Sequence, residues 1–181
     1  MEHVFLGPLR PYDGRGSVTR MIRRLTESDL PWAETFLDET MAGRVQARRG
    51  ELVDVLDAPG FVAERNGERV GLLTYRRHDD GCELAVIVVR DQFHGVGTEL
   101  VEALVREIAG RARIWLVTTN DNLDAIRFYQ RRGFRLAVLR PDAITEARET
   151  IKPAISEVGA YGIPIRDELE LELPPGATVG E

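Results

Sequence analysis

QFHGVGTEL, residues 92–100, places Gly95 and Gly97 directly before a run of residues with helical apolar spacing. The first N–H groups of a helix lack intrahelical partners and lie at the positive end of its dipole, so they favour an anion such as phosphate. The stretch lacks the GK[ST] of a Walker loop and the third glycine of a dinucleotide fingerprint. Taken alone, it is equally typical of a tight strand-to-helix turn that needs glycine only for its geometry.

Apolar runs on both sides of this loop predict a strand before it and a helix after it. CELAVIVV (82–89) is continuously apolar, which is typical of a central strand buried on both faces. From Val96 to Ile108 apolar residues recur at helical spacing, and Gly110 follows where a helix would end. IWLVTT (114–119) predicts a second buried strand. The loop therefore joins the centre of a sheet to a helix.

The rest of the pattern predicts a mixed α/β domain. Asn66-Gly67, between two apolar runs, is a strong signal for a two-residue hairpin turn. We expect further strands at 21–25, 61–65, 69–77, 134–140 and 165–173, and helices at 28–38, 45–56, 123–132 and 143–152. This order, β-α-α-β-β-β-α-β-α-β-α-β, predicts a single domain with about seven strands in a mixed sheet flanked by helices.

Length and composition are those of an ordinary single-domain protein. The chain has 181 residues, 43% of them hydrophobic and 30% charged. A net charge of −6 argues against a broad nucleic-acid surface and mildly favours cationic substrates. No run approaches the roughly 18 apolar residues of a membrane span, and the first twenty residues lack the apolar core of a signal peptide. We therefore expect a cytoplasmic protein that binds neither membranes nor nucleic acid.

Metal and thiol chemistry are not expected. Cys82 is the sole cysteine, which excludes an internal disulfide and a thiolate metal cluster. The histidines His3, His78 and His94 are widely spaced and show no ligand pattern. We therefore expect no metal site and interpret Cys82 as a small buried residue.

The two ends of the chain differ in composition from its centre. Residues 1–20 contain prolines and glycines that suit a flexible lead-in, and Met21 begins a sharply different stretch. Translation from Met21 rather than Met1 is one hypothesis for this change. We place the folded domain at residues 21–175 and a flexible tail at 176–181.

A second stretch, TTNDNLDAIRFYQRRGF (118–134), leaves a buried strand through a polar turn and enters a short helix. Asn122, Ala125 and Tyr129 are three and then four residues apart, so they share one face of that helix. Taken alone, Phe128 and Tyr129 are most typical of core aromatics.

Together the two stretches resemble a known family. QFHGVG fits the pattern Q/R-x-x-G-x-G/A, and NLDAIRFYQRRGF fits N-x-x-A-x-x-x-Y-x-x-x-G-F at the expected distance downstream. The pair is similar to the motifs of the GNAT superfamily of acyl-CoA-dependent N-acetyltransferases, and MIRRLTESDL resembles the usual opening of that fold. The resemblance covers about residues 21–140. The tail KPAISEVGAYGIPIRDELELEL also resembles that of a bacterial GNAT subgroup.

The resemblance implies a cleft for acetyl-CoA between two splayed central strands. It implies that backbone N–H groups of the loop hold the pyrophosphate of coenzyme A, through Gln92, Phe93, His94, Gly95, Val96, Gly97 and Thr98. It also implies that main-chain groups of the splayed strand near Ile87, Val88 and Val89 pair with the pantetheine amides, with an oxyanion held by a backbone N–H around Val89. Asn122 would contact the cofactor from the other side of the cleft. The side chain of His94 equally fits a solvated position.

Two residues are implied for proton transfer. Tyr129 lies where the family's general acid usually lies, and its hydroxyl could protonate the departing thiolate while its ring packs in the core. Glu83 is an acid within an apolar run, so it is a candidate general base or water-holding residue; an edge-exposed structural acid is the alternative. The glutamate used by some family members would fall at Gly81 instead. Cys82 should face away from Glu83, which argues against a covalent acyl intermediate.

The closing segment IRDELELEL (165–173) alternates acids and leucines. Glu168, Glu170 and Glu172 therefore share one strand face, which we interpret as a solvated face. The alternative is that they line the acceptor pocket and attract a cation. That pocket is otherwise expected from the first two helices, the loop at 40–44 and the C-terminal strands.

The predicted function is N-acetylation: an acetyl group moves from acetyl-CoA to a primary amine by direct attack in a ternary complex. The acceptor is a small-molecule or peptide amine, and a homodimer is left open. A non-catalytic acyl-CoA-binding sensor and a purely structural α/β domain are the alternatives. Neither needs a tyrosine or a carboxylate near the thioester.

Overall fold

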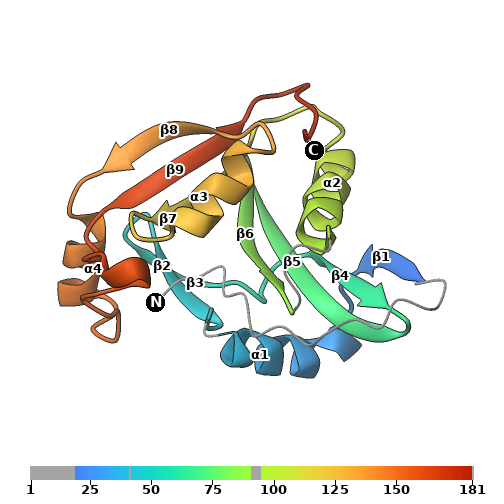
Figure 1. Cartoon of the computed structure of the whole chain (residues 1–181), viewed down its shortest axis with the longest axis horizontal. Coiled ribbons are helices and arrows are strands. Elements are labelled where there is room, and N and C mark those ends of the chain that lie inside the picture. Colours follow the sequence, from blue (N-terminus) through green and yellow to red (C-terminus); the bar gives the residue numbers. More distant parts are fainter. Residues whose placement is uncertain (1–18, 41, 91–94, 181) are drawn as a thin grey trace.

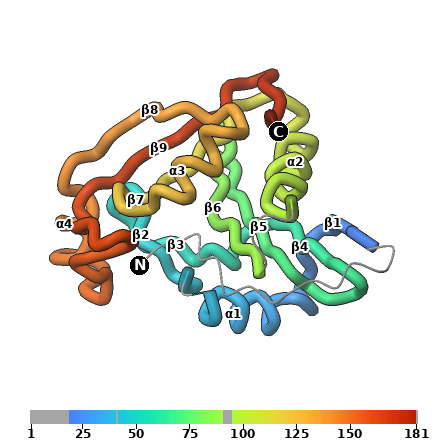
Figure 2. The backbone as a smooth tube through the Cα atoms, in the orientation of Figure 1, coloured from blue at the N-terminus to red at the C-terminus, as the bar shows by residue number. Residues whose placement is uncertain are grey.

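The structure, a computed structural model, describes residues 19–40, 42–90 and 95–180 (Figure 1). Within these residues seven strands form one mixed sheet, as predicted, and their order in the sheet is β1-β4-β5-β6-β7-β9-β8. They are β1 (Arg20–Arg24), β4 (Gly60–Arg65), β5 (Glu68–His78), β6 (Gly81–Val89), β7 (Ile114–Thr119), β8 (Arg135–Arg140) and β9 (Glu168–Leu173). Figure 2 shows β8 and β9 together at one end of this sheet and β1 at the other.

The helices are α1 (Leu30–Glu39), α2 (Val96–Ile108), α3 (Leu123–Gln130) and α4 (Ala143–Thr150). The first of them was expected to begin at Ser28, but a 3₁₀ turn (Glu27–Asp29) precedes it and Pro31 lies in its first turn. The predicted Asn66-Gly67 hairpin turn is confirmed, because both residues have positive φ (51° and 80°) between β4 and β5.

The prediction of a helix at 45–56 is wrong, because this segment forms a β-hairpin. β2 (Val45–Arg48) and β3 (Glu51–Asp54) pair antiparallel around Arg49 and Gly50. These two turn residues have φ values of 51° and 82°, the positive pair that a two-residue hairpin turn requires. Three of the four β2 side chains are buried, so packing against the sheet overrides the helical propensity of this segment.

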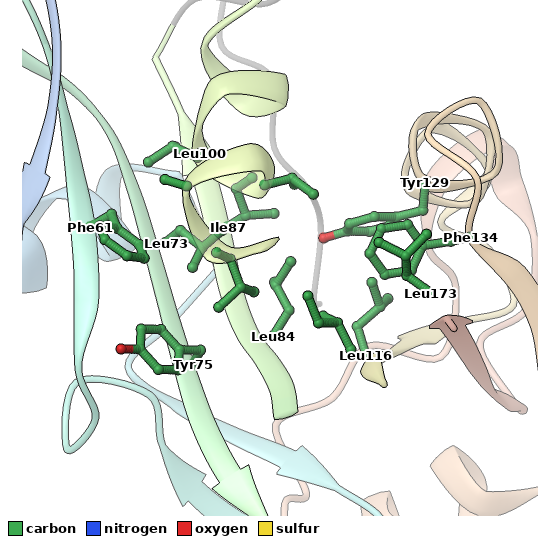
Figure 3. Packing of buried hydrophobic residues seen from close by; sticks show 14 of the residues in the cluster. Phe61, Leu73, Tyr75, Leu84, Ile87, Leu100, Leu116, Tyr129, Phe134 and Leu173 are labelled. Carbon is green, nitrogen blue, oxygen red and sulfur yellow. The ribbon is translucent and has the colours of Figure 1, made fainter. Parts of the chain in front are cut away.

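The core lies on both faces of the sheet. On one face, α2 and α3 pack against β4 to β7 and β9, with Leu100 and Tyr129 among the buried side chains (Figure 3). On the other face, α1 packs Phe36 and Leu37 against β5 and β6. Strand β6 contributes to both layers, with Leu84 on the first face, so the prediction of a central strand buried on both faces is confirmed.

Two irregularities in β6 position the candidate site. Thr74 pairs with Val86 but Tyr75 pairs with Leu84, so Ala85 is an extra residue in a β-bulge. On its other side β6 pairs with β7 at two described positions, Cys82 with Ile114 and Glu83 with Trp115. Beyond these pairs the two parallel strands diverge. The predicted splay of the central strands is therefore confirmed.

Candidate active site

The divergence of β6 and β7 opens a cavity of ≈ 40 Å³. Its walls are residues 84–87 of β6, residues 116–118 of β7 and the start of α3. Ala42, Gln46 and Arg48 close it from the side of the β2–β3 hairpin. Strand β6, helix α3 and the β2–β3 hairpin thus meet where the pairing between β6 and β7 has ended.

The start of α2 lies next to this cleft and depends on two glycines. Gly95 caps the helix with φ = 81°, a left-handed conformation that glycine adopts without strain. A Cβ added to Gly97 would lie 3.1 Å from the ring of Phe128, so this glycine allows α2 and α3 to pack closely. The backbone N–H groups of Val96, Gly97 and Thr98 precede the first hydrogen bond of α2, which Glu99 N–H donates to the Gly95 carbonyl at 3.0 Å. The predicted site residues Gln92, Phe93 and His94 lie outside the described residues.

A cation lies at this helix start, and the sequence analysis missed it. Arg132 donates from Nε to the hydroxyl of Thr98 at 3.0 Å, and its guanidinium lies 3.7 Å from the centre of the Phe128 ring. Burial lowers the pKa of Arg132, and the neighbouring Arg131 lowers it further. In the sequence, Arg132 stands near the end of the helix predicted at 123–132, where a basic residue is ordinary. Nothing in the local sequence indicates that it lies beside α2.

Tyr129 lines the cavity from α3 and is 3% exposed. Its ring contacts Phe128 at 5.0 Å and Phe134 at 5.2 Å between centroids. Figure 3 shows its hydroxyl directed from α3 towards Ile87 of β6. Burial raises the pKa of Tyr129 well above its ordinary value. Its ring thus packs in the core while its hydroxyl lies at the cavity.

Asn122 is the N-cap of α3 and also lines the cavity. Its Oδ1 accepts a hydrogen bond from the backbone N–H of Ala125 at 3.3 Å, so one role of this residue is to fix the helix start. On the facing strand, Ile87, Val88 and Val89 lie beyond the last β6–β7 pair. Of these, Ile87 lines the cavity opposite Asn122, whereas Val88 and Val89 do not line it.

Glu83 is buried at 2% exposure, which excludes the edge-exposed alternative. Its Oε1 lies 3.6 Å from Nη1 of Arg48, and its Oε2 lies 3.6 Å from Nη1 of Arg76. His78 Nε2 lies 3.2 Å from the same Oε2. Glu83 does not line the cavity itself, but it contacts Arg48, which does. The carboxylate therefore belongs to a charged cluster at the base of the cleft.

The solvated face predicted for Glu168, Glu170 and Glu172 is wrong. Glu168 and Glu170 are buried, and Arg140 pairs with both, at 3.2 and 2.6 Å. Arg113 lies 3.0 Å from both Glu170 and Glu172. The β2–β3 hairpin covers this face, since the Arg49 backbone N–H donates to Glu168 at 2.9 Å. None of the three acids lines the described cavity.

Cys82 is buried in the core layer formed with α2 and α3, and burial raises the pKa of its thiol to about 12. Its neighbour Glu83 belongs to the opposite side, as the strand alternation predicted. Within the described ranges, no group of three His, Cys, Asp or Glu side chains could hold a metal ion. No helix in this part of the chain is long and apolar enough to cross a membrane.

Comparison with known proteins agrees with this arrangement. Residues 19–134 match the sequence model of the acetyltransferase (GNAT) family. The uncharacterized protein YdhI of Bacillus subtilis is 43% identical over 120 residues, which are 64% of this chain and 72% of YdhI.

Two solved structures share the fold. A GNAT family acetyltransferase from Elizabethkingia anophelis with acetyl-CoA bound has a TM-score of 0.66 at 17% identity, covering 86% of this chain and 97% of its own. The ribosomal-protein-S18-alanine N-acetyltransferase from Escherichia coli has a TM-score of 0.63 at 22% identity, with coverage of 88% and 96%. At these identities the likeness is one of fold.

Proposed function

The chain belongs to the GNAT acetyltransferase family and is an acetyl-CoA-dependent acyltransferase, and we propose that it transfers the acetyl group directly to a primary amine held in the same cleft. The observation that carries the proposal is the divergence of β6 and β7 directly opposite Tyr129. A purely structural domain would gain no stability from interrupting the hydrogen bonds between β6 and β7 at this point. We further propose that the protein acts in the cytoplasm.

The residues present fit coenzyme A at two places. Beyond Glu83, the backbone of β6 has no β7 partner in its ladder, so it can pair with an amide-bearing arm as in strand addition. The N-terminus of α2, with Gly95, Gly97 and the cation of Arg132 beside it, suits a pyrophosphate. When bound, the thioester supplies an activated acyl group. Residues on both sides of the cleft, among them Asn122, would orient the thioester.

Tyr129 is the proposed general acid. Its hydroxyl is protonated at neutral pH, as in any tyrosine, and burial raises its pKa further. The hydroxyl is directed across the cleft towards β6. It would donate its Oη proton to the departing sulfur, which avoids expelling a bare thiolate from the thioester. The tight aromatic packing around it fixes the direction of the hydroxyl.

Glu83 is the proposed proton acceptor for the attacking amine. Because its side chain does not line the cavity, it would act through a water. His78, with 31% of its side chain exposed, connects this carboxylate to solvent. A proton accepted at Glu83 thus has a short exit from the site.

A direct test follows CoA release over a panel of primary amines with the wild type and Tyr129→Phe. We expect the variant to lower kcat about 10²- to 10⁴-fold, the usual contribution of a positioned acid, with little change in acetyl-CoA affinity. Tyr161→Phe is the matched control, because this exposed tyrosine lies outside the cavity. An unchanged kcat in Tyr129→Phe would remove the acid role. Tight CoA binding without turnover of any amine would favour a sensor.

A further inference from the structure

Arg48 is a buried cation whose guanidinium is only partly hydrogen-bonded. Its side chain is 8% exposed. Nε donates to Oε1 of Gln46 at 3.1 Å, and Nη2 donates to the same oxygen and to the carbonyl of Ala85. Nη1 has no hydrogen-bond partner in the part of the chain that the structure describes. The guanidinium is therefore held in place on one side and unsatisfied on the other.

This unsatisfied group belongs to a residue that lines the cleft. Arg48 lines the cavity together with Tyr129, and the carbonyl it binds belongs to the β-bulge residue of β6. Its positive charge is close enough to Tyr129 to offset part of the effect of burial on that pKa. An oxygen placed in the cavity could thus reach both Nη1 and the proposed acid.

The hydrogen bonding of Arg48 is incomplete. Among the described residues Glu83 is its ion-pair partner, and the 3.6 Å between Oε1 and Nη1 is too long for a hydrogen bond. The same carboxylate lies 3.6 Å from Arg76, but that side chain is 36% exposed, so solvent screens its charge. Glu83 therefore balances the charge of Arg48 but leaves the Nη1 hydrogen bonds unmade within the described residues.

The neighbouring acids do not supply this hydrogen bond. Glu168 and Glu170 pair with Arg140, and Glu170 and Glu172 pair with Arg113. A buried guanidinium with an unmade hydrogen bond is costly, and an anionic oxygen makes the strongest, charge-assisted hydrogen bond to it. A neutral thioester carbonyl would make a weaker one.

We propose that Arg48 recognises the acceptor, and that the acceptor is a small primary amine that carries a carboxylate, which binds Nη1 in the cavity. The inference rests on the proposed acetyl transfer and narrows its substrate. The cavity of ≈ 40 Å³ holds about three waters, which is close to the size of one carboxylate group.

The test compares matched acceptors: glycine, β-alanine and 4-aminobutyrate against their amides and against alkylamines of equal length. We expect the wild type to favour a carboxylate acceptor by about 10- to 100-fold in kcat/KM, as for a hydrogen bond between charged groups. Arg48→Gln should abolish this preference, so that the kcat/KM of each carboxylate acceptor falls to that of its amide. Arg48→Lys should restore part of it. Arg44→Gln, at an exposed arginine paired with Asp54, is the matched control.

Three results would overturn the inference. A wild type without preference for carboxylates would do so while leaving acetyl transfer intact. An equal fall in kcat for every amine in Arg48→Gln would assign Arg48 to the thioester instead. If no amine is turned over, the proposed function fails, and the melting temperature then tests the carboxylate site by itself. The amino acids should raise the melting temperature of the acetyl-CoA-loaded wild type but not that of Arg48→Gln. Equal or absent shifts in both would exclude a carboxylate site.

Discussion

Glu83→Gln keeps the shape of a buried side chain and removes the negative charge that two arginines share. At 3.6 Å and an effective dielectric constant of about 20, the attraction between Glu83 and Arg48 is about 5 kcal/mol. The Arg76 pair adds less, because that guanidinium is 36% exposed and screened by water. Removing one partner of a buried pair usually costs about 3–5 kcal/mol, since the other charge stays buried. We therefore expect the variant to lose about 3–5 kcal/mol of unfolding free energy.

Urea and thermal denaturation measure this loss. For a chain of this size 1 kcal/mol corresponds to about 2–4 °C, so the melting temperature should fall by about 6–20 °C. Glu102→Gln is the control, because Glu102 is 44% exposed and pairs with Arg106 one turn along α2 at 3.8 Å. Its loss should stay below about 0.5 kcal/mol.

A double-mutant cycle separates the charge pair from simple packing defects. Arg48→Met removes the partner charge, so the double variant Arg48→Met/Glu83→Gln should lose clearly less than the two single losses added together. A loss below about 1 kcal/mol in Glu83→Gln, or strict additivity in the cycle, would refute the reasoning that Glu83 holds a buried cation at the base of the cleft.

Two further predictions concern the helix start and the N-terminal ion pair. Arg132→Gln should raise the KM for acetyl-CoA about tenfold or more with kcat unchanged, because it removes a cation from the start of α2; an equal effect in the exposed control Arg131→Gln would contradict a specific role. Hydrogen bonding to Arg23 holds the pKa of Asp29 far below its ordinary range. Because the folded pKa is the lower one, this pair stabilises the protein above about pH 4 and its contribution is lost as the pH falls. The urea midpoint of the wild type should therefore drop between pH 5 and pH 3 more steeply than that of Asp29→Asn, and parallel curves would contradict this.

The order and type of most elements could be predicted because their signals are local. Asn66-Gly67 demands positive φ at two successive residues, and the apolar run of β6 is too continuous for an exposed strand. Arg49-Gly50 makes the same kind of turn, but arginine gives no hint of positive φ, so the segment around it was interpreted as a helix. There the tertiary packing of β2 determines the secondary structure, and local propensity does not indicate such packing.

The acids of β9 show the same limit in another form. Alternation correctly placed Glu168, Glu170 and Glu172 on one face, but alternation does not reveal what covers a face. Their arginine partners come from β8 and from the residue before β7, and the covering hairpin lies more than a hundred residues earlier in the chain. A polar strand face next to many arginines can therefore be an ion-pair layer rather than a solvated surface.

The two sides of the cleft differ in how the chain encodes them, and this difference explains what could be predicted of the function. The proposed coenzyme A side is built from backbone: a helix start, glycines and a strand edge that does not pair with β7, which need a short local motif and tolerate most side chains. The proposed acceptor side is built from side chains such as Gln46 and Arg48, and Arg48 reaches the bulge at Ala85 because residues 45–54 form a hairpin. A helix over the same residues would direct side chains three and four positions apart to one face, whereas Gln46 and Arg48 are two apart and share a face only in a strand. If the proposal holds, specificity for the amine depends on a segment whose secondary structure the local pattern predicts wrongly.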